Sequence, residues 1–385
     1  MRPSEVDKKE DMPTENGSLI VYGTLRDAAL REVILGQTDH LCLSDVMLEG
    51  YRVSQVKGES FPIIEAAKDQ SAKALRIDGL SPKDRARLDF YESGFAYDVV
   101  QIDGADIYMP PRGQWQAAGP WSLSQWQNDF GEVSRTAAAE VMSYFGQLSG
   151  ADVAARFGMI RARAASRLRA EAGSGPVDGR LSRDDVSLFG HRTPYLNFFA
   201  MDEMDLSFKR FDGSSSPVVT RAAFKSADAA IVLPYDPVRD RVLLVEQFRV
   251  GPYLRGASDC WSMEPIAGLI DAFEAPQDAA HREAMEEAGL KFSALHTVAE
   301  AYPSPGSSTE FFYLYVGTAD LPDDITGVGG EVGEAEDIAS HLLSFDAFMK
   351  VADGGGLKNA PTLLLALWLA RHRDELRAGI TQAHS

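Results

Sequence analysis

The stretch GLIDAFEAPQDAAHREAMEEAGL, residues 268–290, decides the fold of the C-terminal half of the chain. Pro276 suits the first turn of a helix, because its missing N–H is not needed there. Gly289 can adopt the left-handed conformation that commonly ends a helix. The spacing of these two residues therefore predicts a helix of about three and a half turns.

Three glutamates, Glu283, Glu286 and Glu287, share one stripe of this helix, and the opposite side, which can pack, carries His281, Ala284, Met285 and Ala288. Like charges one turn apart repel each other, so this arrangement needs an external reason. A divalent cation supplies one. Carboxylate oxygens suit magnesium, with manganese as a second choice, and no Cys/His spacing favours zinc.

The alternative interpretation is an ordinary acidic surface helix whose glutamates are solvated. Gly268 and Glu274 precede the helix at fixed spacings, which a solvated face does not require. Arg282 cannot ligate a metal, and we expect it to pair with Glu274 and to hold the preceding loop against the helix.

Length and charge limit the classes of function. A chain of 385 residues is long enough for two domains. A net charge of −19 argues against a nucleic-acid or anionic-membrane partner, because such a chain repels polyanions. Cys42 and Cys260 form no disulfide framework, and the acidic N-terminal stretch has no signal-peptide apolar core, so we expect a cytoplasmic protein. The apolar run LLLALWLA, residues 363–370, is too short for a bilayer and predicts one buried helix.

The chain divides by composition into a polar, disordered tail (1–17), a first domain (18–172), a Gly- and Pro-rich linker (173–182) and a second domain (183–378). The first domain ends in a helical part with a basic face, which we interpret as solvated: Arg161, Arg163, Arg167 and Arg169. In the second domain, residues 229–236 and 242–249 predict two strands joined by a turn, and residues 311–317 predict another. The fold class is therefore α+β with two domains.

The second domain resembles the bacterial ADP-ribose pyrophosphatases of the Nudix family over nearly its whole length. Seven positions carry the Nudix box: Gly268, Glu274, Arg282, Glu283, Glu286, Glu287 and Gly289. Further similar stretches are LPYDPVRDRVLLVEQFRVG, WSMEPIAG, YPSPGSSTEFF, GEAEDI and LKNAPTLLLALWLARH, and Pro305 takes the place that distinguishes ADP-ribose enzymes. The resemblance implies an α/β/α sandwich, a homodimer formed through this domain, and magnesium-dependent hydrolysis of ADP-ribose to AMP and ribose 5-phosphate.

The resemblance also implies roles for individual residues. Metals would be held by the carbonyl of Ala267 and the side chains of Glu283, Glu287 and Glu336, with Glu286 in the same cluster. Glu334 matches the candidate general base, although the position of the base differs among Nudix enzymes. Arg249, Arg221 and Glu264 match residues of the substrate site. Ala222 stands where several relatives carry glutamate, which leaves part of the substrate recognition open.

The first domain resembles the gamma-glutamylcyclotransferase-like (AIG2-like) family, through LIVYGTLR (19–26) and RLDFYESGFAY (87–97). The resemblance implies a small β-barrel with helices, in which Tyr22, Gly23, Thr24 and Leu25 form the loop that holds a gamma-glutamyl group. Glu92 takes the acid/base position. The strand SAKALRI departs from the family pattern, and an inert dimerisation or ligand-sensing module is the alternative interpretation.

Three functions therefore remain open. The first is an ADP-ribose hydrolase with an appended cyclotransferase-like domain, favoured by the complete set of glutamates. The second is a hydrolase of another nucleoside diphosphate sugar, such as GDP-mannose, because of Ala222. The third is a non-catalytic ADP-ribose sensor, a class that usually loses glutamates of the box.

Overall fold

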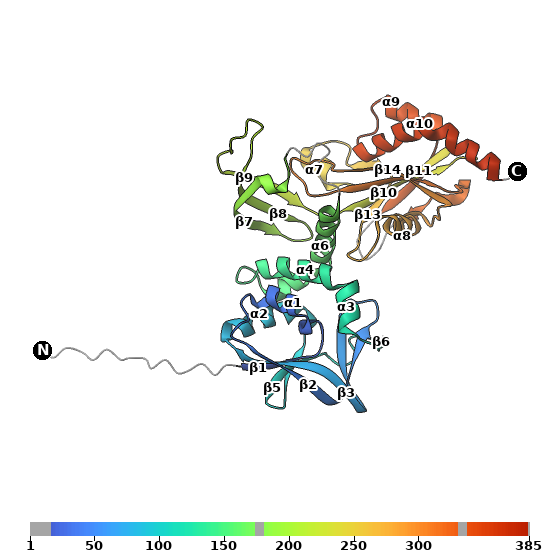
Figure 1. Ribbon diagram of the computed structural model, residues 1–385. Helices are drawn as coiled ribbons and strands as arrows, with labels where there is room; N and C mark the ends of the chain where they lie inside the picture. The colour runs from blue at the N-terminus through green and yellow to red at the C-terminus, as the bar shows by residue number, and fades with distance from the viewer. Residues whose placement is uncertain (1–16, 174–180, 330–336, 384–385) are drawn as a thin grey trace, which may run out of the picture. The chain divides into compact units, whose positions relative to one another are not determined.

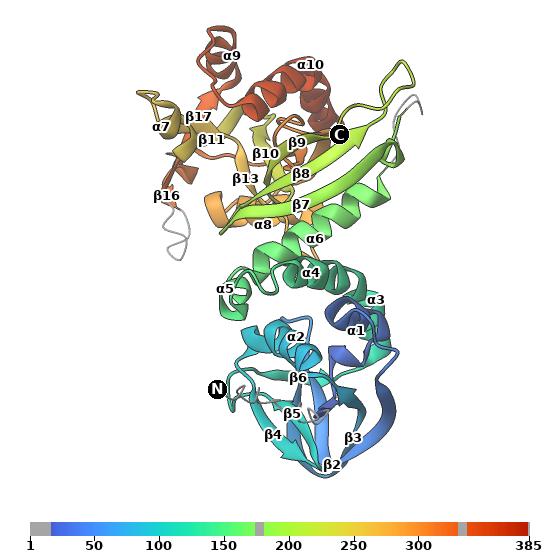
Figure 2. The same ribbon diagram turned by 90° about the vertical axis from the view of Figure 1, so that its left-hand side faces the viewer.

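The structure is a computed structural model that describes residues 17–173, 181–329 and 337–383 (Figures 1 and 2). Its internal contacts divide the chain into two units, and the division falls between Ala164 and Ala165. Helix α6 (Phe157–Ala172) contains this boundary. Both units mix helices and strands, as predicted. Residues 1–16 of the predicted tail and 174–180 of the predicted linker lie outside the described residues.

The first unit is built on a six-stranded sheet. Its order is β4-β5-β1-β3-β2-β6, and only β1 and β5 pair in parallel. The strands are β1 (Gly17–Val21), β2 (Cys42–Val56), β3 (Pro62–Leu80), β4 (Asp98–Ile102), β5 (Ala105–Met109) and β6 (Ala117–Pro120). Within residues 17–173 no strand pair joins β4 to β6, so the closed barrel implied by the resemblance is not shown.

Short helices accompany this sheet: α1 (Ala28–Leu35), α2 (Pro82–Glu92), α3 (Leu123–Asp129), α4 (Gly131–Ser143) and α5 (Gly150–Ala154). Helix α2 begins with a capping box, in which the Ser81 hydroxyl accepts from the Asp84 N–H while the Asp84 carboxylate accepts from the Ser81 N–H. This cap fixes the start of the helix whose last residue is Glu92.

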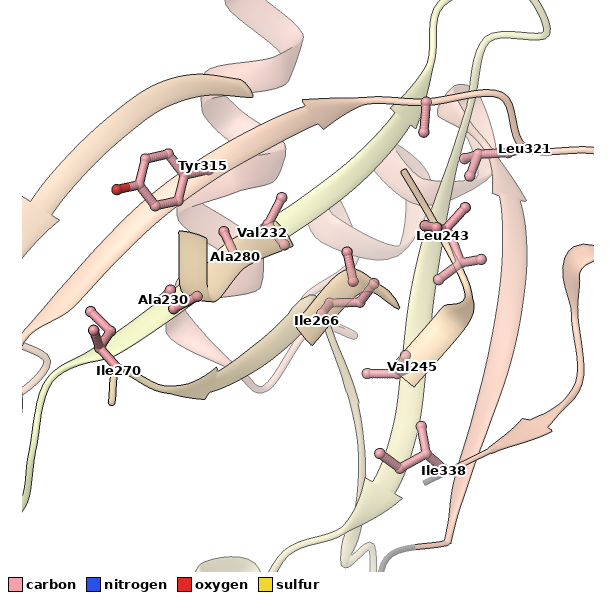
Figure 3. Packing of buried hydrophobic residues seen from close by; sticks show 14 residues of the cluster. Ala230, Val232, Leu243, Val245, Ile266, Ile270, Ala280, Tyr315, Leu321 and Ile338 are labelled. Atoms are coloured by element: carbon pink, nitrogen blue, oxygen red, sulfur yellow. The ribbon is translucent and has the colours of Figure 1, made fainter. Parts of the chain in front are cut away.

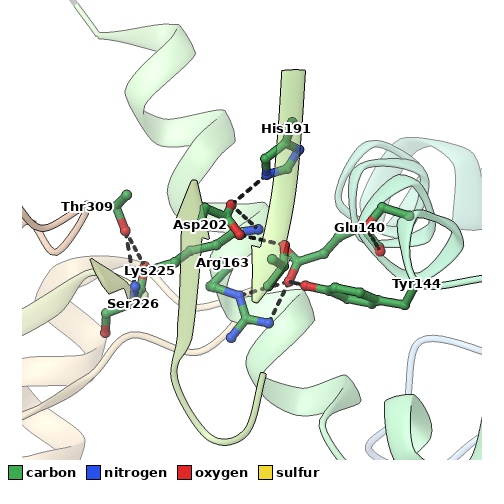
Figure 4. A network of polar contacts seen from close by, with 10 residues as sticks. Glu140, Tyr144, Arg163, His191, Asp202, Lys225, Ser226 and Thr309 are labelled. Carbon is green, nitrogen blue, oxygen red and sulfur yellow. Dashed lines mark hydrogen bonds and ion pairs between the residues drawn. The ribbon is translucent and has the colours of Figure 1, made fainter. Parts of the chain in front are cut away.

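The basic face of α6 is only partly solvated. Arg167 is exposed, but Arg163 is only 4% exposed and donates from Nε to Glu140 at 3.0 Å (Figure 4). Arg169 donates to Asp228 at 2.8 Å within the second unit. The prediction of a solvated face was therefore wrong for these two arginines, because their carboxylate partners come from residues far away in the sequence.

The second unit contains a mixed eight-stranded sheet, with the order β14-β15-β10-β11-β17-β16, β12 beside β11 and β13 beside β10. Its strands are β10 (Ala229–Asp236), β11 (Arg241–Phe248), β12 (Trp261–Glu264), β13 (Ile266–Leu269), β14 (Ala294–Ala301), β15 (Phe312–Thr318), β16 (Val328–Gly329) and β17 (Ile338–Ser344). The strands predicted at 229–236, 242–249 and 311–317 are confirmed to within one residue.

Two hydrophobic layers cover the two faces of this sheet, because alternate residues of each strand point to opposite sides. Ala230 and Val232 of β10 pack with Ile266 and with Ala280 of helix α8 (Pro276–Ala288), as Figure 3 shows. The intervening residues Ile231, Leu233 and Tyr235 pack toward helices α9 (Phe345–Asp353) and α10 (Ala360–Ala383). This arrangement is the expected α/β/α sandwich.

A separate three-stranded antiparallel sheet belongs to the same unit, with the order β7 (Val186–Leu196), β8 (Ala200–Phe208) and β9 (Val219–Lys225). Near one end of the middle strand, the buried carboxylate of Asp202 is held by His191 at 3.0 Å and Lys225 at 3.2 Å (Figure 4). The short helix α7 (Val250–Arg255) follows β11.

The apolar run at 363–370 lies in α10, where Leu365, Ala366 and Leu369 are buried. Leu367 is 51% exposed, so only one side of this helix is covered. Across the described ranges, no helix combines the length and apolar character needed to span a bilayer.

Candidate active sites

The predicted carboxylate helix is α8, which begins at Pro276 and ends at Ala288. Gly289 has a φ of +62° and donates to the Met285 carbonyl at 3.1 Å, which closes the helix as the sequence predicted. Ala279, Ala280 and Ala284 pack into the core, but Met285, expected on the packing side, is 42% exposed. Small alanines allow the helix to approach the sheet closely.

Arg282 holds α8 to the loop that precedes it. Its Nε and Nη2 donate to the two oxygens of Glu274, each at 2.9 Å, and Nη2 also donates to the Leu269 carbonyl at 3.0 Å. The expected pair is therefore present in a bidentate form. Nη1 makes two further contacts, to Glu283 at 2.6 Å and to Glu286 at 3.0 Å. One guanidinium thus holds two of the three stripe carboxylates.

Gly268 lies directly beneath the Glu283 carboxylate. A Cβ atom added to Gly268 would overlap Cδ and Oε1 of Glu283 and would stand only 2.5 Å from Oε2. Gly268 belongs to β13, where it pairs with Ala230 of β10. The glycine is therefore required for close approach, so that a side chain from α8 can reach the backbone of the neighbouring strand.

The three glutamates of the stripe differ in how deeply they are buried. Burial raises the pKa of Glu283 to about 7, although the adjacent Arg282 opposes the increase. Glu287 is also buried, at 9% exposure, whereas the side chain of Glu286 is 50% exposed. The stripe therefore presents carboxylates in three different environments.

A divalent cation fits the donor chemistry of this stripe. Carboxylate oxygens are hard ligands, and a buried carboxylate that resists ionisation gains from a nearby positive charge. The carbonyl of Ala267 belongs to β13, next to Gly268. Among the described residues, no three acidic, histidine or cysteine side chains already converge on one metal position. Glu334 and Glu336, which the resemblance adds to the site, lie outside the described residues.

Arg249 and Glu264, which were each expected in the substrate site, form an ion pair with each other. Arg249 follows β11, and its Nε and Nη2 donate to Oε2 of Glu264 at 3.0 and 2.7 Å. Glu264 is buried, but the Arg249 side chain is 42% exposed. Glu310 was not singled out by sequence reasoning; burial raises its pKa, and the positive charge of Arg249 partly offsets this effect. Its position directly before the strand at 311–317, within the stretch YPSPGSSTEFF, was the available signal.

Arg221 stands apart from these groups. It lies on β9 opposite Met204 of β8, is exposed, and donates to the carbonyl of Thr220 at 3.0 Å. The loop that contains Pro305 is joined to the end of this strand, because Phe224 donates to Ser307 at 2.8 Å and accepts from Thr309 at 2.9 Å. Figure 4 shows Thr309 beside Ser226, whose N–H donates to the Thr309 hydroxyl at 3.1 Å.

The first unit contains a second candidate site, a small pocket of about 60 Å³. Tyr22, Gly23, Thr24 and Leu25 line it together with Glu92, as the resemblance implied. These loop residues follow β1 and form a tight turn, in which Arg26 donates to Gly23 at 3.0 Å. A Cβ atom on Gly23 would meet Pro62 at 2.9 Å, so this position also requires close approach.

Glu92 is 8% exposed, and burial raises its pKa to about 8. It is the one carboxylate among the lining residues, and no lysine or arginine accompanies it. The hydroxyls of Tyr22 and Tyr97 are hydrogen-bonded to each other nearby. A neutral carboxyl close to its titration point can both accept and donate a proton, which is the property of an acid/base residue.

Aromatic rings form much of the wall of this pocket. Phe95 stacks on Tyr97 with ring centroids 5.3 Å apart, and Phe61 meets Phe95 edge to face at 4.8 Å. Trp126 donates from its indole N–H to the Ser60 carbonyl at 2.7 Å. Sequence reasoning missed these rings, because Trp126 and Phe61 are distant from Glu92 in sequence and aromatic residues are common in any core.

Comparison with known families finds one match in each unit. The NUDIX domain family matches residues 225–360, and the family described as gamma-glutamyl cyclotransferase, AIG2-like, matches residues 19–125.

Individual relatives match the second unit. The ADP-ribose pyrophosphatase of Escherichia coli (strain K12) is 34% identical over 195 residues, which cover 51% of this chain and 92% of that protein. The ADP-ribose pyrophosphatase of Haemophilus influenzae is 32% identical over 198 residues, covering 51% of this chain and 91% of that protein. The GDP-mannose pyrophosphatase of Yersinia pestis (strain Pestoides F) is 32% identical over 179 residues, covering 46% and 87%. A crystal structure of an ADP compounds hydrolase aligns over 49% of this chain and 96% of its own, at 20% identity and a TM-score of 0.38.

Proposed function

The chain belongs to the Nudix family of hydrolases through its C-terminal half, and we propose that this half cleaves the diphosphate of ADP-ribose to give AMP and ribose 5-phosphate. The observation that carries the proposal is the complete set of three glutamates on one side of α8. Among them, Glu283 lies against Gly268 and accepts a hydrogen bond from Arg282. The relatives in Escherichia coli and Haemophilus influenzae, both ADP-ribose pyrophosphatases, support the choice of substrate.

We assign magnesium, with manganese as an alternative, to the carbonyl of Ala267 and the carboxylates of Glu283 and Glu287, with Glu286 beside them. When bound, the cation would neutralise the diphosphate and promote ionisation of the attacking water. Arg282 positions the stripe, because its guanidinium ties two glutamates to the loop before the helix. Glu334 would accept the proton of the water, and Glu336 would complete the ligand set.

Arg249 would bind the diphosphate or the terminal ribose of the substrate. The Arg249 side chain is exposed enough to contact a ligand, and its ion pair with the buried Glu264 fixes its orientation. Guanidinium geometry suits a phosphate because two N–H groups can donate in parallel. Arg221 would contribute to a substrate site completed by a second copy of the chain. Exposed apolar residues on β7 support such a homodimer, including Leu188 at 58% and Phe189 at 65% exposure.

Substitution of Glu287 by glutamine tests the hydrolase proposal. We expect turnover of ADP-ribose to fall by about three orders of magnitude or more, because a neutral amide binds a cation far more weakly than a carboxylate does. Turnover is measured as phosphate released by a phosphatase from the products, with magnesium present. Glu375→Gln, an exposed change on α10, is the control and should behave as wild type. Wild-type turnover of Glu287→Gln would refute the metal assignment.

The second candidate substrate is GDP-mannose. The GDP-mannose pyrophosphatase of Yersinia pestis supports it, as does Ala222 in β9, where several ADP-ribose enzymes carry glutamate. The same assay with ADP-ribose and GDP-mannose side by side decides between them by the ratio of kcat/KM. Binding of ADP-ribose without turnover of either compound would instead favour the sensor alternative.

We also propose that the first unit is a gamma-glutamyl cyclotransferase. The amine of the gamma-glutamyl group would attack its own amide carbon, the bond to the leaving amine would break, and 5-oxoproline would form. Glu92 would carry the proton from the attacking nitrogen to the leaving one, for which its buried position and raised pKa are suited. Glu92→Gln should abolish release of 5-oxoproline from gamma-glutamyl amines, whereas Glu32→Gln, exposed on α1, should not. No release by the wild type would refute the proposal.

A further inference from the structure

The first unit contains a second, much larger cavity of about 850 Å³. It is lined by residues of β2, β3 and β6, by the start of α3, and by Arg26 at the end of the 22–26 loop. Strand β6 pairs with β2, so these elements lie together (Figure 1). Pockets for small molecules typically span about 300–1,000 Å³, and this cavity falls within that range.

The charged residues that line this cavity are all basic: Arg26, Arg52 and Lys73. This composition is opposite to that of the whole chain, in which acidic residues outnumber basic ones by 57 to 38. A concave surface of one charge sign concentrates ions of the other sign, because its low-dielectric walls focus the field. The cavity is therefore a local positive site in a strongly negative protein.

These cations are incompletely neutralised. Across the part of the chain that the structure describes, the side chains of Arg26 and Lys73 make no ion pair. Arg52 pairs with Glu65 at 3.3 Å. Burial lowers the pKa of Arg26, and the charge of Asp45 offsets this only in part. A partly buried guanidinium without a carboxylate partner is costly, and an anionic ligand would remove that cost.

The remaining wall supplies hydrogen-bond donors and an apolar surface. Ser71 and Ser122 contribute hydroxyls, and Trp121 contributes an aromatic ring. The indole Nε1–H of Trp121 is buried and has no acceptor among the residues described here. The wall therefore combines hydroxyl groups with an aromatic surface, which suits a ligand that has both oxygen atoms and a carbon skeleton.

We propose that this cavity binds a small organic polyanion, with two or more negative charges on phosphate or carboxylate oxygens, between Arg26, Arg52 and Lys73. Three cations match a dianionic phosphate monoester or a dicarboxylate better than a single carboxylate. The carbon skeleton of the ligand would lie against Trp121. This proposal does not depend on either proposed enzymatic activity.

Adjacent residues of one loop line this cavity and the small pocket that contains Glu92. Arg26 ends the turn whose preceding residues line that pocket. The next residue, Asp27, accepts from Arg135 and from Gln127, and Gln127 lines the large cavity. An anion bound to Arg26 would therefore contact the last residue of the same turn whose preceding residues would hold a gamma-glutamyl group.

Isothermal titration calorimetry on the full chain tests the proposal. The buffer contains EDTA, so that no divalent cation occupies the hydrolase site, and the probes are inorganic phosphate, ribose 5-phosphate, AMP and succinate. We expect saturable binding of at least one probe with a dissociation constant below about 1 mM, and weaker binding as salt increases. Comparison of succinate with the phosphates identifies the anion. Absence of saturable binding for all four probes would overturn the proposal.

Variants locate the binding. The double substitution Arg52→Met with Lys73→Met should weaken binding by at least about tenfold, because two of three cations are removed. Both side chains are exposed, so the fold should be retained, as circular dichroism would verify. Lys83→Met, on the exposed face of α2, is the matched control and should bind as wild type does. Unchanged affinity of the double variant would overturn the proposal, as would loss of binding in Arg249→Met, which would place the anion in the hydrolase site.

Discussion

Replacement of Gly268 by alanine should separate the function of the α8 stripe from the stability of the fold. The new methyl group would overlap the Glu283 carboxylate, with Oε2 only 2.5 Å away, whereas an ordinary contact begins at 3.4 Å. The carboxylate must therefore retreat by at least about 1 Å, away from the strand and out of its 2.6 Å contact with Arg282. A misplacement of about 1 Å at a reacting centre costs on the order of 100-fold in rate.

The cost in folding free energy should be small by comparison. The obstructing atoms belong to the end of a flexible side chain, and Gly268 has no positive φ that alanine would have to adopt. We expect the unfolding free energy to fall by less than about 2 kcal/mol. Urea unfolding measures this quantity, and phosphate release from ADP-ribose products measures turnover.

The Gly268→Ala and Glu283→Gln changes should not be additive, because both act through the same carboxylate. The double variant should therefore be no slower than Glu283→Gln alone. Gly379→Ala on α10, where no atom lies within 4 Å of the added methyl, is the control and should keep full turnover. Turnover of Gly268→Ala within threefold of wild type, or additive losses in the double variant, would refute the reasoning.

Three further predictions concern titration and clamping. Glu92 has a pKa of about 8, and the proposed reaction needs its carboxylate form as the base. The rate of 5-oxoproline release should therefore rise about tenfold per pH unit below pH 8 and level off above pH 8. A flat rate profile from pH 6 to 9 would contradict this expectation. Burial alone would raise the pKa of Asp27, but hydrogen bonds from Arg135, Gln127 and the Leu30 N–H lower it to about 2. The ionised Asp27 carboxylate therefore stabilises the folded state above pH 4, and this stabilisation is lost as the pH falls toward 2. Asp27→Ala should lower the free energy of unfolding, measured with urea, by about 2 kcal/mol at pH 7 and by much less at pH 2.5. Arg282→Lys keeps the positive charge but loses the two parallel hydrogen bonds to Glu274. The free energy of unfolding, measured by thermal unfolding, should fall by about 2–3 kcal/mol. An unchanged melting temperature would argue that the pair of Arg282 and Glu274 does not stabilise the fold.

Local patterns predicted the elements of the second unit well. Strand β10 was expected at 229–236 and is found there, because eight apolar-rich residues bounded by an Asp-Pro turn leave little choice. Helix α8 ends at Gly289 for an equally local reason. The pair between Arg282 and Glu274 was also predictable, since the two partners are only eight positions apart in the sequence.

Features that depend on distant residues were not predictable in this way. The burial of Arg163 depends on Glu140, and the cavity around Arg26 gathers residues from four separate segments. Met285 was expected to pack but is exposed, because helical periodicity identifies a stripe without saying how far the neighbouring strands extend over it. Glu334 and Glu336 stay predictions from the family resemblance.

The pairing of β10 has a consequence for how the chain folds. All eight of its residues are buried, and its parallel partner β15 begins with Phe312, which pairs with Ala229 across 83 positions. On the ribosome, β10 therefore emerges well before the strand that covers one of its edges, and α8 is synthesised in between. One edge of β10 therefore stays unpaired and exposed until β15 has been translated. Nascent chains with such an exposed apolar edge tend to aggregate or to require chaperones. We expect soluble yield to be limited by this interval, and slower translation between β13 and β15 to prolong the exposure.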